Sequence, residues 1–179
     1  LETHATTNRT VGFDHEFNTT TTFWSHHHSS PKKSGGLGLV VNNTFLSRFD
    51  KDPLWEVIDP GRVGCIHLTG PEGNLDLYVC YYDSEHCSIR KATSEKINSH
   101  MAHPDTTLSI MFGDFNFVSS NLDRWNTVST NFSGNKDKAE SEHFHEKLLT
   151  PSRLAELHQE IPTYVGGRAV SRLDRCYSN

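Results

Sequence analysis

The chain has 179 residues, a length that favours a single domain. Hydrophobic residues make up 34% and charged residues 22%, and 10 Phe, 5 Tyr and 3 Trp supply enough aromatic side chains for a core, which excludes a disordered chain. The 17 Lys and Arg against 22 Asp and Glu give a net charge of −5, which disfavours nucleic-acid binding by bulk positive charge. The longest apolar run, 37–41, is too short for a transmembrane helix.

The first half of the chain reads mainly as β-strands. A Thr-rich run after Asn18 leads into a polar loop, the pattern of a strand followed by a loop. Residues 37–41 predict a short buried strand. The β-rich runs 63–68 and 75–82 are separated by strong turn residues, so they are predicted to form a hairpin.

The second half mixes helices and strands. Residues 94–102 have helical character, with Ser94 as the expected N-cap. The other expected elements are strands over 107–112 and 169–177 and helices over 138–149 and 151–159. This irregular alternation indicates an α/β or α+β protein with a mixed sheet, and not a doubly wound parallel fold.

The 4 cysteines contain no C-x-x-C pair, and two of them lie in apolar strand-like runs. We therefore expect free thiols in a reducing compartment inside the cell. The compartment itself, the nucleus included, is left open.

The strongest chemical feature is the segment from Leu108 to Phe117. A buried strand ends in Gly113 and is followed by Asp114 and Asn116, whose spacing at a strand end directs both side chains to one side. A carboxylate in such a loop can orient and deprotonate a water, while the carboxamide holds a phosphate oxygen. The alternative is an Asx-turn, in which both residues only cap the backbone.

Two other segments carry candidate carboxylates. Residues 1–4, Leu-Glu-Thr-His, contain Glu2, which by itself reads as an ordinary surface residue. In the segment 171–177, strand alternation places Asp174 on the opposite side from Leu173 and Arg175. An ion pair between Asp174 and an Arg is the competing interpretation.

In their order, these segments resemble the endonuclease/exonuclease/phosphatase superfamily, the divalent-metal phosphodiesterases related to apurinic endonucleases and deoxyribonuclease I. The G-D-F-N motif is matched at all four positions by residues 113–116. The L-Q-E-T-H motif is matched by residues 1–4 without the Gln, and S-R-I-D-R by residues 171–175. Gly35-Gly36 correspond to a glycine pair that opens a strand, and residues 79–84 match V-Y-A-P-N loosely.

The resemblance implies a four-layer α/β sandwich of two mixed β-sheets flanked by helices, with one active site at the mouth of the sheets. It implies that Glu2 is a metal ligand, that Asp114 activates the attacking water and that Asn116 holds the phosphate. Tyr81 is expected to contact the phosphate and Asp174 to orient a catalytic His. The expected cofactor is Mg²⁺ or Mn²⁺, because carboxylate and substrate oxygens suit a hard cation.

The sequence also departs from the family pattern. An Asn that precedes the Glu motif and an S-D-H triplet that follows S-R-I-D-R are not in this sequence, and Asp83-Ser84 replace Pro-Asn. We therefore expect residues 1–179 to form a single domain of this family that lacks the first strand and the C-terminal S-D-H segment. Such a fold is incomplete, and activity of the truncated chain stays open.

The leading functional hypothesis is a DNA endonuclease of retroelement type, because S-R-L-D-R resembles the endonuclease domains of non-LTR retrotransposons. The alternatives are a phosphatase on a small or lipid phosphate ester and an inactive binding module of the same fold. DNA requires several Lys or Arg residues along a groove, whereas a small ester requires one or two. The candidates for such a basic rim are Arg124, Arg168, Arg172 and Arg175, and Trp125 is a candidate for the groove itself. We expect no membrane partner.

Overall fold

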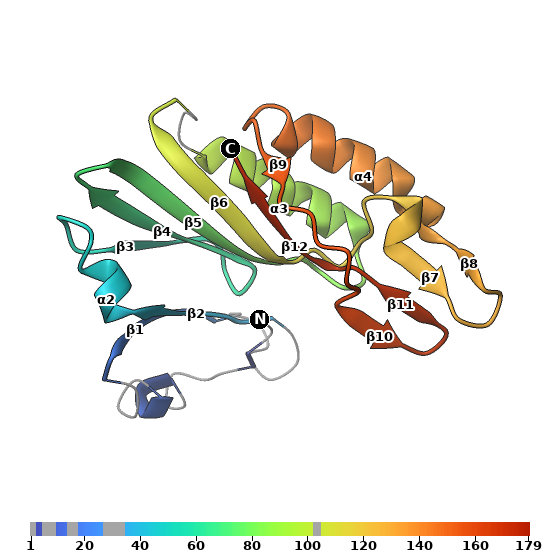
Figure 1. Ribbon diagram of the computed structural model, residues 1–179, viewed down its shortest axis with the longest axis horizontal. Helices are drawn as coiled ribbons and strands as arrows, with labels where there is room; N and C mark the ends of the chain where they lie inside the picture. The colour runs from blue at the N-terminus through green and yellow to red at the C-terminus, as the bar shows by residue number, and fades with distance from the viewer. Residues whose placement is uncertain (1–2, 5–9, 14–17, 27–34, 102–104) are drawn as a thin grey trace.

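A computed structural model describes residues 3–4, 10–13, 18–26, 35–101 and 105–179 of the chain. Its centre is a six-stranded mixed sheet that separates two helices on one face from a two-stranded sheet on the other (Figure 1). The predicted α/β sandwich of mixed sheets is thereby confirmed. Of the four layers expected, the described residues form these three.

The central sheet has the strand order β3-β4-β5-β6-β12-β9. Its strands are β3 (Leu54–Asp59), β4 (Val63–Gly70), β5 (Gly73–Tyr81), β6 (Thr107–Asp114), β9 (Ala155–Glu156) and β12 (Asp174–Ser178). β5 and β6 are parallel, and every other neighbouring pair is antiparallel. The parallel pair is joined through helix α3 (Cys87–His100), as a parallel crossover requires.

Side-chain alternation gives the central sheet two apolar faces. One face packs against α3, α4 (Lys138–Phe144) and the π-helical turn η3 (His145–Leu149). This main core includes the buried side chains of Tyr78, Tyr82, Ile97, Met111, Phe115, Phe117, Phe144, Leu148 and Tyr177. The opposite face packs Val79, Tyr81 and Phe112 against Leu37 and Leu39 of the second sheet. Because both faces are covered, the central strands are close to continuously apolar.

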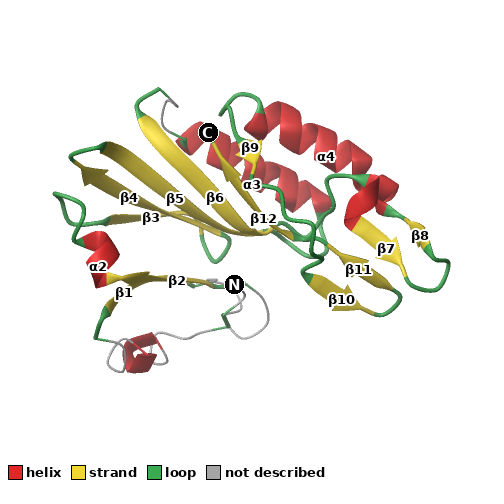
Figure 2. Ribbon diagram, viewed as in Figure 1, coloured by secondary structure: helices red, strands yellow, loops and turns green. Residues whose placement is uncertain are grey.

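The second sheet pairs β1 (Thr20–Ser25) with β2 (Leu37–Asn42), which leads into helix α2 (Asn43–Leu46). A third sheet, with the order β10-β11-β7-β8, lies at the other end of the molecule (Figure 2). Its strands are β7 (Arg124–Asn126), β8 (Asn131–Phe132), β10 (Tyr164–Gly166) and β11 (Ala169–Ser171). Two short helical turns, η1 (Asn121–Asp123) and η2 (Gly134–Asp137), connect it to the core. No described helix is long and apolar enough to cross a membrane.

The strands expected at 37–41 and 107–112, the hairpin of 63–68 with 75–82 and the helix over 138–149 are all confirmed. The predicted start of α3 is wrong. The helix begins at Cys87, and Ser94 lies buried within it instead of capping it. The Ser94 hydroxyl donates to the Arg90 carbonyl at 3.0 Å and lies 3.0 Å from the Tyr82 hydroxyl, so a residue type typical of caps serves the core here.

The helix predicted over 151–159 is also wrong. The backbone turns at Arg153, whose φ is +54°, and then forms the strand β9. β9 extends the central sheet by pairing with β12 at Tyr177↔Glu156, so tertiary pairing overrides the helical pattern. The expected run 169–177 is two strands, β11 and β12, that belong to different sheets.

Candidate active site

Three of the residues singled out in the sequence form one row across the central sheet. Tyr81 at the end of β5 pairs with Asp114 at the end of β6, and Asp114 pairs with Asp174 at the start of β12. Directly opposite residues on neighbouring strands project from the same face and lie about 5 Å apart. The row is on the face that packs against β2, because Tyr81 belongs to the apolar cluster of that interface. The row therefore lies on the side of the central sheet that faces the second sheet.

The loop after Asp114 has a backbone that depends on Gly113. Its φ is +147°, and a Cβ at this position would lie 1.9 Å from the Cys80 carbonyl oxygen. The close approach lets β5 and β6 pair up to their last residues, with Tyr82 N–H donating to the Asp114 carbonyl at 2.8 Å. Gly113 thus sets the position of the carboxylate that follows it.

Asn116 follows in a left-handed conformation with φ of +53°, and its N–H donates to the Asp114 Oδ1 at 2.9 Å. This is the Asx-turn that the sequence left as an alternative. The Asn116 side-chain amide donates to the Tyr82 carbonyl at 2.8 Å. That bond uses one of the two amide hydrogens, so the turn holds Asn116 beside Asp114 without consuming its remaining hydrogen-bonding capacity.

Glu2 lies outside the described residues, but its neighbour Thr3 is described. The Thr3 N–H donates to the Gly36 carbonyl at 3.0 Å, and the Gly36 N–H donates to the Gly61 carbonyl at 2.9 Å. The residue after Gly61 in turn accepts a 2.7 Å hydrogen bond from the N–H of Tyr81. Backbone hydrogen bonds, with the peptide bond between Gly61 and Arg62, therefore connect Thr3 to Tyr81.

Asp83 is the first of the two residues that replace Pro-Asn of the family pattern, and its contacts are structural. Its carboxylate accepts hydrogen bonds from the backbone N–H groups of Glu85 and His86 and forms a 2.5 Å ion pair with Arg62. Burial alone would raise the pKa of Asp83, but the N–H groups of His86 and Glu85, the His86 ring and Arg62 together lower that pKa to about 2. Asp83 therefore anchors the turn that leads into α3, and Arg62 is committed to it.

The arginines proposed as a basic rim are mostly not at the surface. Arg172 is 5% exposed, and its guanidinium contacts the carboxylates of Asp123, at 2.7 and 2.9 Å, and Glu156. Arg124 forms an ion pair with Asp137 at 3.3 Å. The charges of both arginines are therefore already matched by carboxylates within the protein.

Arg175 is buried as well, at 3% exposure. Its guanidinium carbon lies 4.8 Å from the centre of the Phe117 ring and 5.7 Å from that of Phe115, and one nitrogen donates to the Phe117 carbonyl. Of the four arginines considered, only Arg168 is exposed. The predicted basic rim is therefore wrong for Arg172, which pairs with carboxylates, and for Arg175, which packs against aromatic rings.

Asp174 carries a carboxylate that forms no ion pair with another described residue. Its backbone is held by Thr163, the residue before β10, whose hydroxyl accepts hydrogen bonds at 3.0 Å from the N–H groups of both Leu173 and Asp174. The alternative of a structural Asp174–Arg pair is thus wrong within the described chain. Strand alternation is as predicted, because Leu173 and Arg175 are buried while Asp174 is half-buried.

A groove of about 360 Å³ lies beside the third sheet. Trp125 and Phe132 line it, with their rings edge to face at a centroid distance of 5.0 Å, and Arg172 also lines it. None of Tyr81, Asp114, Asn116 and Asp174 lines this groove, so a role of Trp125 in binding substrate stays a prediction.

The arrangement of strands is shared with two solved structures. The chain superposes on the endonuclease domain of TRAS1, a telomere-specific non-LTR retrotransposon, with a TM-score of 0.58 and 16% identity over 89% of this chain. It superposes on a humanised TDP2 of D. rerio with a TM-score of 0.61 and 14% identity over 96% of this chain. The chain has the endonuclease/exonuclease/phosphatase fold.

The fold likeness covers most of this chain but only 66% of the TRAS1 domain and 65% of the TDP2 chain. No family model and no curated protein matches the sequence. At such low identity the endonuclease/exonuclease/phosphatase fold is what the likeness establishes.

Proposed function

We propose that the chain is a Mg²⁺-dependent phosphodiester hydrolase domain that acts on DNA, of the retroelement endonuclease type. The observation that carries the proposal is the register that brings Tyr81, Asp114 and Asp174 into one row. These residues come from three motifs far apart in the chain, and the fold is shared with a retrotransposon endonuclease domain. The motifs of Tyr81 and Asp174 are weak alone and G-D-F-N is fairly specific, and their convergence at neighbouring strand ends supports a shared site.

The side chains of the row suit a hard cation. Two carboxylates at directly opposite strand positions repel each other, and a divalent cation beside them offsets this repulsion. The oxygens of Asp114, Asp174 and Asn116 fit Mg²⁺, which binds through one or two carboxylates plus substrate oxygens and waters. We propose Glu2 as a further ligand, by its match to the first motif. When bound, the ion supplies charge stabilisation at the phosphoryl oxygens.

The other steps fall to the protein's own groups. Asp114 orients a water and accepts its proton, and the second amide hydrogen of Asn116 contacts a phosphate oxygen. The Tyr81 hydroxyl donates to the phosphate from the neighbouring strand. The Asx-turn and the bond from Asn116 to the Tyr82 carbonyl hold Asp114 and Asn116 in place, so that little reorganisation is needed on binding.

A second candidate is hydrolysis of a small phosphate ester. It is favoured by one observation, namely that Arg172 and Arg175 are buried and that Arg124 is paired with Asp137. A long DNA strand gains from several exposed cations, whereas a small ester requires one or two.

Nicking of supercoiled plasmid in the presence of Mg²⁺ tests the proposal. We expect nicking by the chain, suppression by a chelator, and a loss of about 100-fold or more in Asp114→Asn and Glu2→Gln. Asp52→Asn is the matched control, because Asp52 is exposed and lies in the loop before β3. Hydrolysis of bis(p-nitrophenyl) phosphate and p-nitrophenyl phosphate without plasmid nicking would favour the second candidate. No Mg²⁺-dependent hydrolysis of any of these substrates would refute both for this chain and favour the inactive binding module.

A further inference from the structure

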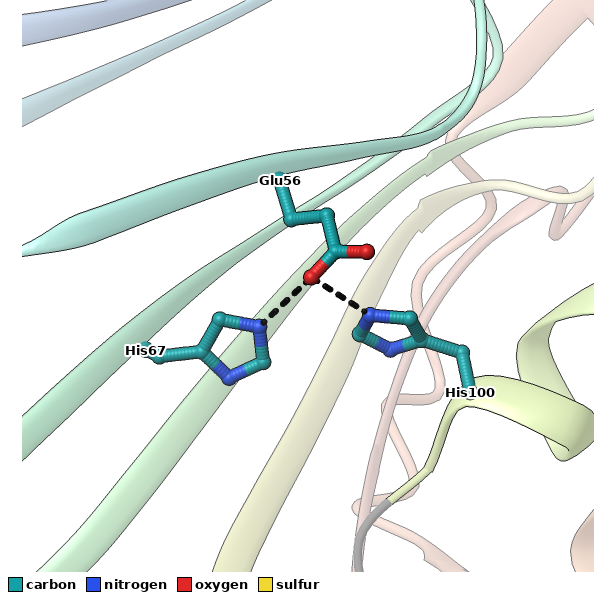
Figure 3. A group of neighbouring side chains, drawn as sticks. All are labelled: Glu56, His67 and His100. Atoms are coloured by element: carbon teal, nitrogen blue, oxygen red, sulfur yellow. Dashed lines mark ion pairs between the residues drawn. The ribbon is translucent and has the colours of Figure 1, made fainter.

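A cluster of metal-ligating side chains lies on the helix-facing side of the central sheet, away from the row of Tyr81, Asp114 and Asp174. Glu56 of β3, His67 of β4 and His100 at the end of α3 point toward one another (Figure 3). His67 pairs across the strands with Asp76, which is five residues before Tyr81 on β5. Five residues of strand span about 17 Å, so this cluster is separate from the candidate active site.

The distances within the cluster match those between ligands of one ion. The Glu56 Oε2 lies 3.1 Å from the His100 Nε2 and 3.7 Å from the His67 Nε2. Two ligands of a tetrahedral zinc ion, each about 2.1 Å from it, are about 3.4 Å apart. All three ligand atoms lie within 4.8 Å of one another. A small closing movement of the side chains therefore places an ion between them.

Each histidine is oriented by a second group behind it. The His67 Nδ1 lies 2.8 Å from the Oδ1 of Asp76, a carboxylate that is 4% exposed. A buried carboxylate holds the proton on Nδ1, so the lone pair is on the Nε2 that points toward Glu56. The His100 Nδ1 lies 3.2 Å from the hydroxyl of buried Tyr78. A carboxylate behind a ligating imidazole, as Asp76 is behind His67, is a usual arrangement of a protein zinc site.

A competing set of ligands, Cys65, Asp76 and the other nitrogen of His67, is less suitable. Cys65 is fully buried, and the His67 Nδ1 that faces its Sγ at 4.0 Å is already hydrogen-bonded to Asp76 at 2.8 Å. The set around Glu56 is open to solvent instead. A groove of about 290 Å³ is lined by His67, Asp76 and His100, and the Glu56 side chain is 53% exposed.

We propose that Glu56, His67 and His100 bind a zinc ion, with Asp76 and Tyr78 as supporting groups and water in the remaining position. Two imidazoles and one carboxylate select zinc and related transition metals over Mg²⁺, which prefers oxygen ligands alone. Because the three ligands come from β3, β4 and α3, the ion joins an edge strand and a helix end to the middle of the sheet. Its role is to stabilise this part of the domain.

The proposal is tested by calorimetry, in which Zn²⁺ is titrated into the chelator-treated chain at pH 7 in excess Mg²⁺. We expect one equivalent of Zn²⁺ to bind and to raise the melting temperature, and Co²⁺ to give the visible absorption of a four-coordinate site. The double variant His67→Ala, His100→Ala should lose both effects while its circular dichroism stays that of the wild type. Asp76→Asn should weaken binding by about 10- to 100-fold.

Two controls separate this cluster from other histidines. His143 pairs with a single carboxylate, Glu95, at 3.5 Å, so His143→Ala should bind Zn²⁺ like the wild type. Alanine at all of His26, His27 and His28 removes the consecutive histidines of the sequence and should also leave the site intact. Asp114→Asn should lose hydrolysis but keep Zn²⁺ binding. The proposal is overturned if the wild type does not bind Zn²⁺, or if the double variant binds it as tightly.

Discussion

Asp114 and Asp174 lie directly opposite each other on the antiparallel strands β6 and β12. The two residues are separated by 59 intervening positions in the sequence, and no local pattern connects them. The pairing is set by the backbone, since the Phe115 N–H donates to the Leu173 carbonyl at 3.0 Å just beyond the last pair. The register thus brings two carboxylates together where the strands begin to separate.

The first prediction concerns Asp174 and rests on the proposed hydrolase function. Asp174→Asn keeps the shape of the side chain but removes one of the two facing charges, so the Mg²⁺ concentration for half-maximal hydrolysis should rise by about tenfold. Part of the lost activity should return at high Mg²⁺. Activity measured against Mg²⁺ concentration checks this. An unchanged Mg²⁺ dependence would exclude Asp174 from the cation site, while a large fall in melting temperature would indicate a structural role.

The second prediction concerns Gly113. Gly113→Ala forces a left-handed φ on Ala and drives its Cβ into the Cys80 carbonyl, so the free energy of unfolding should fall by about 3 kcal/mol or more. Gly73 is the matched control, because its φ is +126° but no atom lies within 4 Å of a Cβ there. Gly73→Ala should cost about 1–2 kcal/mol, from backbone strain alone. Urea unfolding of both variants measures the difference, and equal losses would contradict the role of the Cys80 contact.

The third prediction concerns the arginines. Arg172→Ala leaves the buried carboxylate of Asp123 without its partner and should lower the free energy of unfolding by about 3–5 kcal/mol. Arg168→Ala, at an exposed position, should change it by less than about 0.5 kcal/mol. If the chain binds DNA, the same Arg168→Ala variant should also show a smaller salt dependence of DNA binding. Thermal unfolding measures the structural role of Arg172, and DNA binding at several salt concentrations measures the role of Arg168. An Arg172→Ala variant as stable as the wild type would refute the structural role.

The fourth prediction is a pH dependence of stability. The folded pKa of Asp83, about 2, lies below the usual value of 3.8, so its contribution is present above about pH 4 and is lost as the pH falls toward 2. The shift corresponds to about 2 kcal/mol. The wild type is compared with Asp83→Asn, so that the difference between them reports this carboxylate alone. The difference in free energy of unfolding between them should shrink by this amount between pH 5 and pH 2, and a constant difference would contradict the assignment.

Much of the fold could be predicted from local patterns. The hairpin of β4 and β5 follows from two β-rich runs around a Gly-Pro-Glu-Gly-Asn turn, and β6 follows from an apolar run that ends at Gly113. The failures occur where tertiary contacts override local preference. Ser94 bonds to a core tyrosine instead of capping a helix, and Ala155–Glu156 form an edge strand because β12 offers free backbone groups. The expectation that residues 1–179 form one domain lacking its first strand and S-D-H segment stays a prediction.

The sequence by itself determined which residue types were available for chemistry, because Asp114 and Asn116 follow a strand-ending glycine and their Asx-turn is local. Only the tertiary structure decided which distant residues meet. It placed Tyr81, Asp114 and Asp174 in one row, put Arg172 and Arg175 inside the protein, and brought Glu56, His67 and His100 together from three elements. The physical reason is that strand register and side-chain burial depend on pairing and packing between distant segments, which a single linear pattern does not encode.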